Sequence, residues 1–384
     1  MIKISVCILF LSYISAEINS NKFKILITVR ESKSFINDID GLSSNHTLIY
    51  LLYTYTEPYQ LVKLNTSTLH PLSSAILPFH YNDTTFRQDF FLLTFSDDQI
   101  FVGYVQDEGK PAAATWLQAI DLRSMTINEN LKQDFSFKQF SGFPLFQAIS
   151  NQQKIIVNLW QCLEFVPRDL TTKNITKPEI INGQLPSADP YDSWLLPSIS
   201  SLDETPQLLL MYDENILYTL NVSCSSQWII NTQLSNIQLE FLSKSLSFHM
   251  DVVNASTIAV ADDQMNVFVY NLYGQQLSTT LNLRQMFPDY PRMSEQIASN
   301  LRANDHYVYV TSSTNVEPFD QQYLFRIRLN DTMKDVDLLP FADENYGLTE
   351  LITFTDTVYS FERLYEAEDY FNIYKIGTPH RNIY

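Results

Sequence analysis

Glycine is scarce in this chain, with only 8 among 384 residues. Because glycine is the usual residue at turn positions with positive φ, the turns must be built largely from Asn, Asp, Ser and Pro. The sequence also lacks a phosphate-cradling glycine loop and the Gly-x-Ser-x-Gly elbow of hydrolases. Two common kinds of ligand-binding and catalytic motif are therefore excluded.

Positive charge is also in short supply. The chain has 25 Lys and Arg against 43 Asp and Glu, which gives a formal net charge of −18. Phosphate neutralisation needs clustered basic residues, so we expect no nucleic-acid partner and no attraction to an anionic membrane surface. A soluble acidic protein kept apart by mutual repulsion fits this balance.

Long hydrophobic runs are absent except at the N-terminus. There, Lys3 precedes an apolar run from Ile4 to Ile14, which ends at Ser15 and Ala16. This order is typical of a secretory signal peptide, although Ile14 stands where a small residue is usual, and the run is shorter than the roughly 20 residues of a membrane span. We predict a signal peptide over residues 1–16 and a secreted protein with no membrane span in the mature chain. The alternatives are a lumenal protein of the secretory or lysosomal pathway and an uncleaved anchor.

An internal repeat occupies the rest of the chain. A short hydrophobic strand followed by a turn recurs seven times, about every 50 residues. The seven strands end at Asn65, Asp121, Asp169, Asn221, Asn271, Asn330 and Gly377. Each is preceded by two further strands, and a weaker strand follows each except the last. Four short antiparallel strands per repeat predict one all-β domain over residues 17–384, a seven-bladed β-propeller, with a β-sandwich pair as the alternative.

The two ends of the chain fit a closed ring. The last repeat stops at Tyr384, which leaves no room for its fourth strand, whereas residues 22–30 form an alternating apolar strand before the first repeat. We predict that residues 22–30 pair with the strand near Phe371 to Ile376. This pairing removes a bare sheet edge from the last blade.

The repeat resembles the β-propeller superfold, and its period is similar to that of kelch repeats. The paired glycines of kelch blades are absent, as are the Trp-Asp ending of the WD type and the boxes of sialidases. The resemblance implies a fold and no particular function.

Seven Asn-x-Ser/Thr sequences predict a glycoprotein. In a propeller, the turns between the first and second strands and between the third and fourth strands share one face. Six of the sequons map to that face and one to a loop on the other; the six are Asn45, Asn65, Asn174, Asn221, Asn254 and Asn330, and the seventh is Asn82. Glycans on these asparagines would crowd one face and leave the other open.

The open face has long loops that combine an acid, a proline and an aromatic residue. Such loops suit an extracellular protein, peptide or carbohydrate ligand. The alternative is that the prolines stiffen the loops and the aromatic rings tuck against the rim. The candidate ligand-binding residues are Glu57, Tyr59, Asp189, Tyr191, Trp194, Asp289, Tyr290, Glu317, Phe319, Glu368 and Tyr370.

Catalytic candidates are few. His249 and Asp251 lie two residues apart on an innermost strand, so they share one face that could point into the central channel. Asp262 and Asp263, in the turn between the second and third strands of the fifth repeat, could help to hold calcium. We expect no cofactor other than calcium, and a non-enzymatic recognition module. The alternatives are a propeller-type secreted hydrolase with a channel-located or calcium-assisted site, and a structural coat or matrix component.

Two cysteines remain once Cys7 leaves with the signal peptide. An oxidising compartment favours a disulfide between Cys162 and Cys224. The repeat places them on opposite faces of neighbouring blades, about 17–20 Å apart, whereas a disulfide needs Cα atoms within about 7 Å. We therefore predict that they do not pair.

Overall fold

The fold is taken from a computed structural model of the chain, which describes its strands and many of the turns. The described residues are 23–32, 35–42, 47–53, 58–80, 90–96, 99–106, 114–136, 148–150, 155–157, 161–165, 180–182, 194–196, 207–212, 216–221, 229–230, 237–238, 248–254, 257–271, 276–314, 321–329, 333, 335–342, 348–354, 356–364 and 370–379. The predicted signal peptide and Cys224 lie outside these ranges. No helix among the described residues is long and apolar enough to cross a membrane.

The described strands form seven antiparallel sheets, numbered here I to VII along the chain. Sheet I has β2 (Phe35–Leu42), β3 (Thr47–Tyr53), β4 (Pro58–Leu64) and β5 (Pro71–His80). Sheet II has β6 (Phe90–Ser96), β7 (Gln99–Gln106), β8 (Ala114–Asp121) and β9 (Thr126–Ser136). Sheet III has β10 (Ala148–Ser150), β11 (Ile155–Val157), β12 (Gln161–Phe165) and β13 (Ile180–Asn182). Sheet IV has β14 (Trp194–Leu196), β15 (Gln207–Tyr212), β16 (Ile216–Asn221) and β17 (Ile229–Ile230), with β18 (Ile237–Gln238) also paired to β16.

The remaining sheets complete the set. Sheet V has β19 (Phe248–Asn254), β20 (Thr257–Asp262), β21 (Asn266–Asn271) and β22 (Leu281–Asn282). Sheet VI has β23 (Gln296–Ala303), β24 (Tyr307–Thr314), β25 (Gln321–Arg328) and β26 (Val336–Ala342). Sheet VII has β27 (Leu348–Phe354), β28 (Thr357–Leu364), β29 (Tyr370–Gly377) and, from the other end of the chain, β1 (Lys24–Ser32). The prediction of an all-β chain with four-stranded antiparallel sheets is confirmed.

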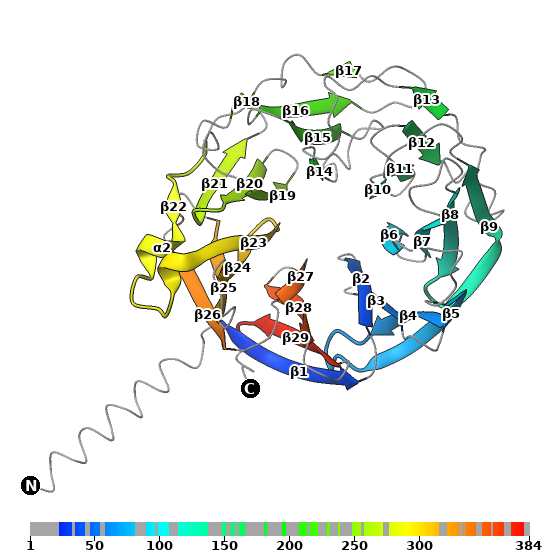
Figure 1. Cartoon of the computed structure of the whole chain (residues 1–384), viewed down its shortest axis with the longest axis horizontal. Coiled ribbons are helices and arrows are strands. Elements are labelled where there is room, and N and C mark those ends of the chain that lie inside the picture. Colours follow the sequence, from blue (N-terminus) through cyan, green and yellow to red (C-terminus); the bar gives the residue numbers. More distant parts are fainter. Residues whose placement is uncertain are drawn as a thin grey trace, which may run out of the picture.

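The sheets stand around a common centre, with the first strand of each innermost and the fourth at the outside (Figure 1). In sheet VII the outer position is taken by β1, which pairs with β29 from Lys24 opposite Gly377 to Ser32 opposite Tyr370. These are the two segments that the sequence predicts to pair.

The third repeat differs in register from the prediction. Its third strand is predicted to end at Asp169, whereas β12 spans Gln161–Phe165. Cys162 therefore lies within a strand, where it stands opposite Ile181 of β13. Because Cys224 is outside the described residues, the absence of a disulfide stays a prediction.

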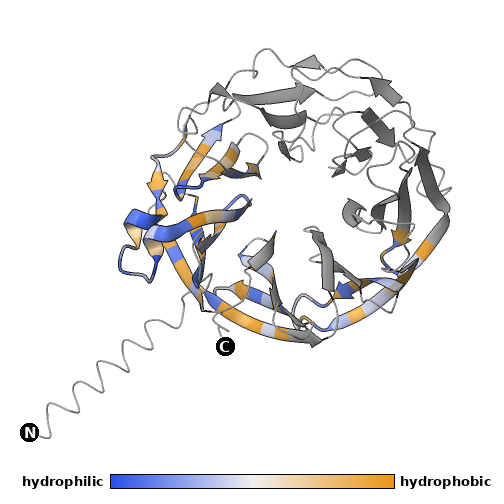
Figure 2. Ribbon diagram, in the orientation of Figure 1, coloured by the Kyte–Doolittle hydropathy of each residue, from blue (hydrophilic) through white to orange (hydrophobic). Residues whose placement is uncertain are grey.

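Apolar side chains fill the space between neighbouring sheets. The largest described cluster joins β20 and β21 of sheet V to β23, β24 and β25 of sheet VI, with Val310, Phe325 and Ile327 fully buried. Orange segments are interspersed with blue and white ones along the coloured strands (Figure 2), and central strands such as β20 and β25 are buried along almost their whole length. Sheets V and VI are therefore held together by buried aliphatic and aromatic contacts.

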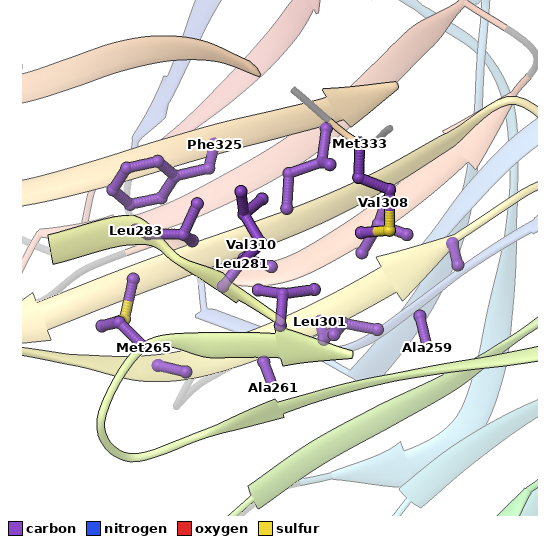
Figure 3. Close-up of a cluster of buried hydrophobic side chains, with 14 of the residues drawn as sticks. Ala259, Ala261, Met265, Leu281, Leu283, Leu301, Val308, Val310, Phe325 and Met333 are labelled. Carbon is purple, nitrogen blue, oxygen red and sulfur yellow. The ribbon is translucent and has the colours of Figure 1, made fainter. Parts of the chain in front are cut away.

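Large apolar residues occupy turn positions where glycine is usual. Leu69, Met125, Met265 and Met333 have φ between 46° and 61° and are all buried. Met265 and Met333 lie among the aliphatic side chains of the cluster between sheets V and VI (Figure 3). A positive φ costs a residue with a Cβ roughly 1 kcal/mol, and burying a Met or Leu side chain returns about 1.5–3 kcal/mol. The chain can therefore form these turns with few glycines.

Candidate functional site

The predicted central pair, His249 and Asp251, contacts the neighbouring sheet. Oδ2 of Asp251 in β19 accepts a hydrogen bond from the backbone N–H of Ala303 in β23 at 2.8 Å. Burial lowers the pKa of the His249 imidazole; a hydrogen bond with the backbone of Ala298 opposes this, and the nearby Arg302 adds to it. The pair thus links the inner strands of sheets V and VI.

The same kind of link continues to the next sheet. Nε of Arg302 in β23 donates to the carbonyl of Leu351 in β27 at 3.2 Å, and Thr353 Oγ1 donates to the carbonyl of Ala303 at 3.4 Å. Three adjacent inner strands are therefore joined by side chains that reach a neighbour's backbone. A general acid or base must reach a substrate proton, and the described contacts of Asp251 are directed to protein backbone instead.

The predicted calcium pair shapes a hairpin. Asp262 is only 2% exposed, and its carboxylate accepts from the backbone N–H groups of Gln264 and Asn266 at 2.9 and 2.8 Å and from Asn266 Nδ2 at 2.8 Å. No group of three or more His, Cys, Asp or Glu that could hold a metal occurs in the described part of the chain. The described contacts of Asp262 are those of a turn that caps its own backbone.

The connection from β22 to β23 is the long loop that the structure describes most fully. It contains α2 (Leu283–Met286) and η5 (Met293–Glu295), and it projects beyond the outer side of the ring (Figure 1). Asn282 caps α2 by accepting from the backbone N–H of Gln285 at 2.9 Å. We refer to residues Leu283–Glu295 as the 283–295 connection.

Arg284 fixes the base of the 283–295 connection. Its Nε donates to the carbonyl of Gln296 at 2.8 Å, and its two terminal nitrogens donate to the carbonyl of Asp263 at 3.0 Å and to Gln264 Oε1 at 3.1 Å. The planar guanidinium thus ties the connection to both the start of β23 and the hairpin before β21. Asp263 therefore helps to position this loop.

An aromatic group fixes the tip of the same connection. The Tyr290 ring packs edge-on against Phe287 and Tyr323, with centroids 5.8 and 5.9 Å away, and the Tyr323 hydroxyl donates to the carbonyl of Pro291 at 2.6 Å. Tyr290 nevertheless remains 39% exposed, and the adjacent Asp289 is exposed as well. The connection thus presents an aromatic ring and a carboxylate to solvent in a defined conformation.

Three other predicted ligand residues lie on strands, which corrects their assignment to loops. Tyr59 is only 1% exposed, because β4 begins at Pro58 and places its ring in the core. Trp194 begins the innermost strand β14, and Tyr370 begins β29. The remaining candidates lie outside the described residues; they are Glu57, Asp189, Tyr191, Glu317, Phe319 and Glu368.

Three predicted glycosylation sites are described, each at the end of a first or third strand. Asn65 follows β4, Asn221 ends β16, and Asn254 ends β19. Asn65 Oδ1 accepts from the backbone N–H groups of Ser67 and Thr68 at 2.8 and 3.2 Å, so none of these bonds uses Nδ2, the atom to which a glycan attaches. Asn45, Asn82, Asn174 and Asn330 lie outside the described residues.

Sequence reasoning missed a set of basic residues at equivalent positions on third strands. Lys63, Arg326 and Lys375 pair with the third residue of the preceding strand, namely Ile49, Tyr309 and Tyr359. Each reaches a residue one or two positions after the third strand of the next sheet: Lys63 Nζ donates to the carbonyl of Leu122, Arg326 to Thr378 Oγ1, and Lys375 Nζ to the carbonyl of Thr66, at 3.3, 2.8 and 2.8 Å. We call these the third-strand links.

The link made by Arg326 also holds both ends of the described chain. Its guanidinium lies 4.3 Å from the ring centre of Phe23, just before β1, and 4.9 Å from that of Tyr307. Its Nε donates to Asp337 at 2.9 Å, and the Thr378 that it contacts lies just after β29. Nearby, burial raises the pKa of the Tyr309 hydroxyl. A recurring basic residue near the end of the third strand is the sequence signal that could have revealed these contacts.

Comparison with known proteins identifies the fold. No protein-family model matches the chain, and no curated protein sequence matches it. Among solved structures, a chain of a mitotic checkpoint complex matches with a TM-score of 0.52 at 10% identity, over 91% of each chain. The C-terminal WD40 domain of Sif2 matches with a TM-score of 0.50 at 10% identity, over 94% of this chain and 99% of that domain.

These similarities support a β-propeller and give no support to the kelch-like period that the sequence suggested. At 10% identity the comparison carries no information about ligands or activity. The chain thus has the β-propeller fold, and the comparisons show nothing finer.

Proposed function

We propose that this chain is a secreted or lumenal glycoprotein that acts as a non-enzymatic recognition module for an extracellular protein, peptide or carbohydrate. In this proposal it is a seven-bladed propeller closed by its N-terminal strand. The pairing of β1 with β29 and the contacts of Arg326 with Phe23 and Thr378 support closure. A rigid ring suits recognition because its loops are presented on a fixed scaffold.

The observation that carries the proposal is the 283–295 connection. Asp289 and Tyr290 are exposed at its tip, while Arg284 and Tyr323 hold its backbone in place. Binding to an ordered loop avoids most of the entropy cost of immobilising it. Tyrosine supplies a large contact area with few rotatable bonds, so it is among the residues that most often dominate binding energy.

The hydrolase alternative draws less support from the described residues. His249 and Asp251 contact neighbouring backbone, and Asp262 caps its own hairpin. No specific observation in the described part of the chain favours a reaction over binding. We therefore propose recognition, and we propose that the tip of the 283–295 connection contacts the ligand.

The proposal is tested by ligand capture with the immobilised protein. Wild-type protein, an Asp289→Asn/Tyr290→Ser double variant and Arg123→Ala are presented to secreted proteins from the source organism and, separately, to a glycan array. Arg123 is exposed in the turn between β8 and β9 and serves as the control. We expect a ligand held by wild type and Arg123→Ala and bound at least about 10-fold more weakly by the double variant.

Two results contradict the proposal. One is equal retention of every ligand by all three proteins, which would show that the 283–295 connection does not contribute to recognition. The other is the absence of any ligand for the wild-type protein in both screens. A protein ligand and a carbohydrate ligand are distinguished by which of the two screens gives the signal.

A further inference from the structure

The fourth strand of sheet I, β5, lacks the charges found on the other long outer strands. Its sequence is PLSSAILPFH, with no Asp, Glu, Lys or Arg, in a protein of net charge −18. The three other described fourth strands with seven or more residues each contain charge. Charged residues on an edge strand discourage pairing with another chain, and β5 has none of them; Pro71 and Pro78 limit pairing only at the two ends of the strand. The charged residues of the other three strands are Lys24, Arg30 and Glu31 in β1; Glu129, Lys132 and Asp134 in β9; and Asp337 in β26.

The solvent face of β5 is also apolar. Leu72 and Ile76 are 58% and 62% exposed, the highest values among the large hydrophobic residues that the structure describes as exposed. Ser74 between them is exposed too, whereas Ala75 and Leu77 on the other side of the strand are buried. Exposed apolar side chains of this size on a monomer indicate a contact surface when they lie together.

Among the described strands, β5 is an edge strand. The strand pairs with β4, and no other described strand pairs with its second edge. Free N–H and C=O groups on such an edge form a template for another strand. Pro71 and Pro78 lack an N–H, so they confine regular pairing to the six residues Leu72–Leu77 between them.

The pattern of β5 is complementary to itself. When two copies of the strand run antiparallel and Ser74 faces Ser74 of the second copy, Leu72 lies opposite Ile76 of the second copy, and Ile76 opposite Leu72. Directly opposed residues in antiparallel strands have Cβ atoms about 4.5–5.5 Å apart, so both apolar pairs come into contact. A symmetric contact of this kind uses the same patch on both molecules and closes on itself.

We propose that the protein forms a two-fold symmetric homodimer through antiparallel pairing of β5 with β5 of a second copy. The second copy is the occupant that the strand sequence favours, because the exposed Leu72 and Ile76 lie opposite each other when two copies of β5 pair antiparallel. The paired strands also bring no Asp, Glu, Lys or Arg into the contact between two molecules of net charge −18. An interface of one strand pair is below the usual size of a permanent interface, so the dimer is reversible. This inference is independent of the proposed recognition function.

Sedimentation equilibrium measures the dimer directly. Protein secreted from eukaryotic cells is used, so that glycans attached at the flanking sequons Asn65 and Asn82 are present. We expect the wild type to dimerise at or below about 100 μM, and Ile76→Lys to weaken dimerisation at least 10-fold. Leu277→Lys changes an equally apolar side chain, 49% exposed and away from β5, and should dimerise as the wild type does.

Cross-linking tests the geometry. Ser74→Cys places two thiols across the two-fold axis, within the Cα separation of a disulfide, and should give a covalent dimer on non-reducing gels. Ser294→Cys, exposed on the 283–295 connection, serves as the control and should stay monomeric on the same gel. A wild-type monomer at all concentrations up to about 100 μM overturns the proposal, as does a dimer that is insensitive to Ile76→Lys or that forms only after glycan removal. Capture of another protein's strand by a monomeric β5 overturns it as well.

Discussion

Lys375 donates a hydrogen bond from Nζ to the backbone carbonyl of Thr66 across 2.8 Å, although the two residues are 309 positions apart in the chain. The same carbonyl accepts the hydroxyl of Tyr359 at 3.0 Å. Two donors from sheet VII thus meet on one atom of sheet I. With Lys63 and Arg326, this contact places third-strand links at three successive interfaces, from sheet VI through sheets VII and I to sheet II.

Replacing Lys375 by methionine is expected to destabilise the protein. Methionine keeps most of the apolar stem but removes the charged donor to Thr66, so we expect a loss of about 1 kcal/mol in the free energy of unfolding. Chemical denaturation of both proteins measures the difference. Lys24→Met, at an exposed position of β1, removes the same charge and should change stability little. Equal losses in the two variants would show that net charge, and not the link, matters.

Tyr359 should make the protein sensitive to alkali. Burial raises the pKa of its hydroxyl from 10.0 to about 12, so the folded state keeps its proton while the unfolded state loses it. The stabilisation is complete below pH 10 and is lost as the pH rises towards 12. We expect the melting temperature of Tyr359→Phe to start lower, because a hydrogen bond is lost, and to fall less steeply above pH 10 than that of the wild type. Parallel curves for the two proteins would contradict this.

A substitution of Met265 tests whether burial of its side chain outweighs the cost of its positive φ. Its φ is 61° and its side chain is fully buried, so Met265→Gly relieves the backbone and empties part of the core. The lost side chain outweighs the relief, and we expect a net loss of about 2 kcal/mol. Arg292 has a φ of 51° but a partly exposed side chain, so Arg292→Gly should stay within about 0.5 kcal/mol of the wild type. Similar losses at both positions would refute the argument.

Two substitutions of Asn65 distinguish its role as a glycan acceptor from its role in forming the turn. Asp121 occupies the equivalent turn of sheet II, where its Oδ1 accepts from the N–H groups of Arg123 and Ser124 at 2.9 and 2.8 Å. We therefore expect Asn65→Asp to lose the glycan and keep the turn, and Asn65→Ala to lose both and about 1 kcal/mol. Glycopeptide mapping and thermal unfolding of the secreted protein measure the two effects. An unmodified Asn65 in the wild type, or equal destabilisation by both variants, would contradict the prediction.

Local sequence patterns were sufficient to predict the four-stranded repeat and the pairing of the two ends. Alternation in residues 22–30 and the missing fourth strand of the last repeat led to β1 opposite β29. Asx residues at strand ends predicted the turns, as Asn65 and Asp121 show. Both signals depend on residues that are neighbours in the sequence, which is why they could be read without a structure.

Contacts between sheets could not be predicted in the same way. Tyr59 looks like a loop residue in the sequence because it follows a proline, yet its ring is buried. The bonds of Asp251 to Ala303 and of Arg302 to Leu351 depend on how far one sheet is rotated against the next, which no local pattern encodes. Sequence reasoning therefore found polar residues near the centre and could not tell that their partners were neighbouring backbone.

The pairing of β1 with β29 has a consequence for biosynthesis. During translation β1 emerges long before its partner β29, because all the other described strands lie between the two in the chain. At about 5–20 residues per second, β1 waits for tens of seconds without its partner. An apolar strand left waiting in this way is a binding site for chaperones, and sheet VII is complete only after β29 has been made. Synthesis of β29, and not an early folding nucleus, then sets the moment at which sheet VII can form.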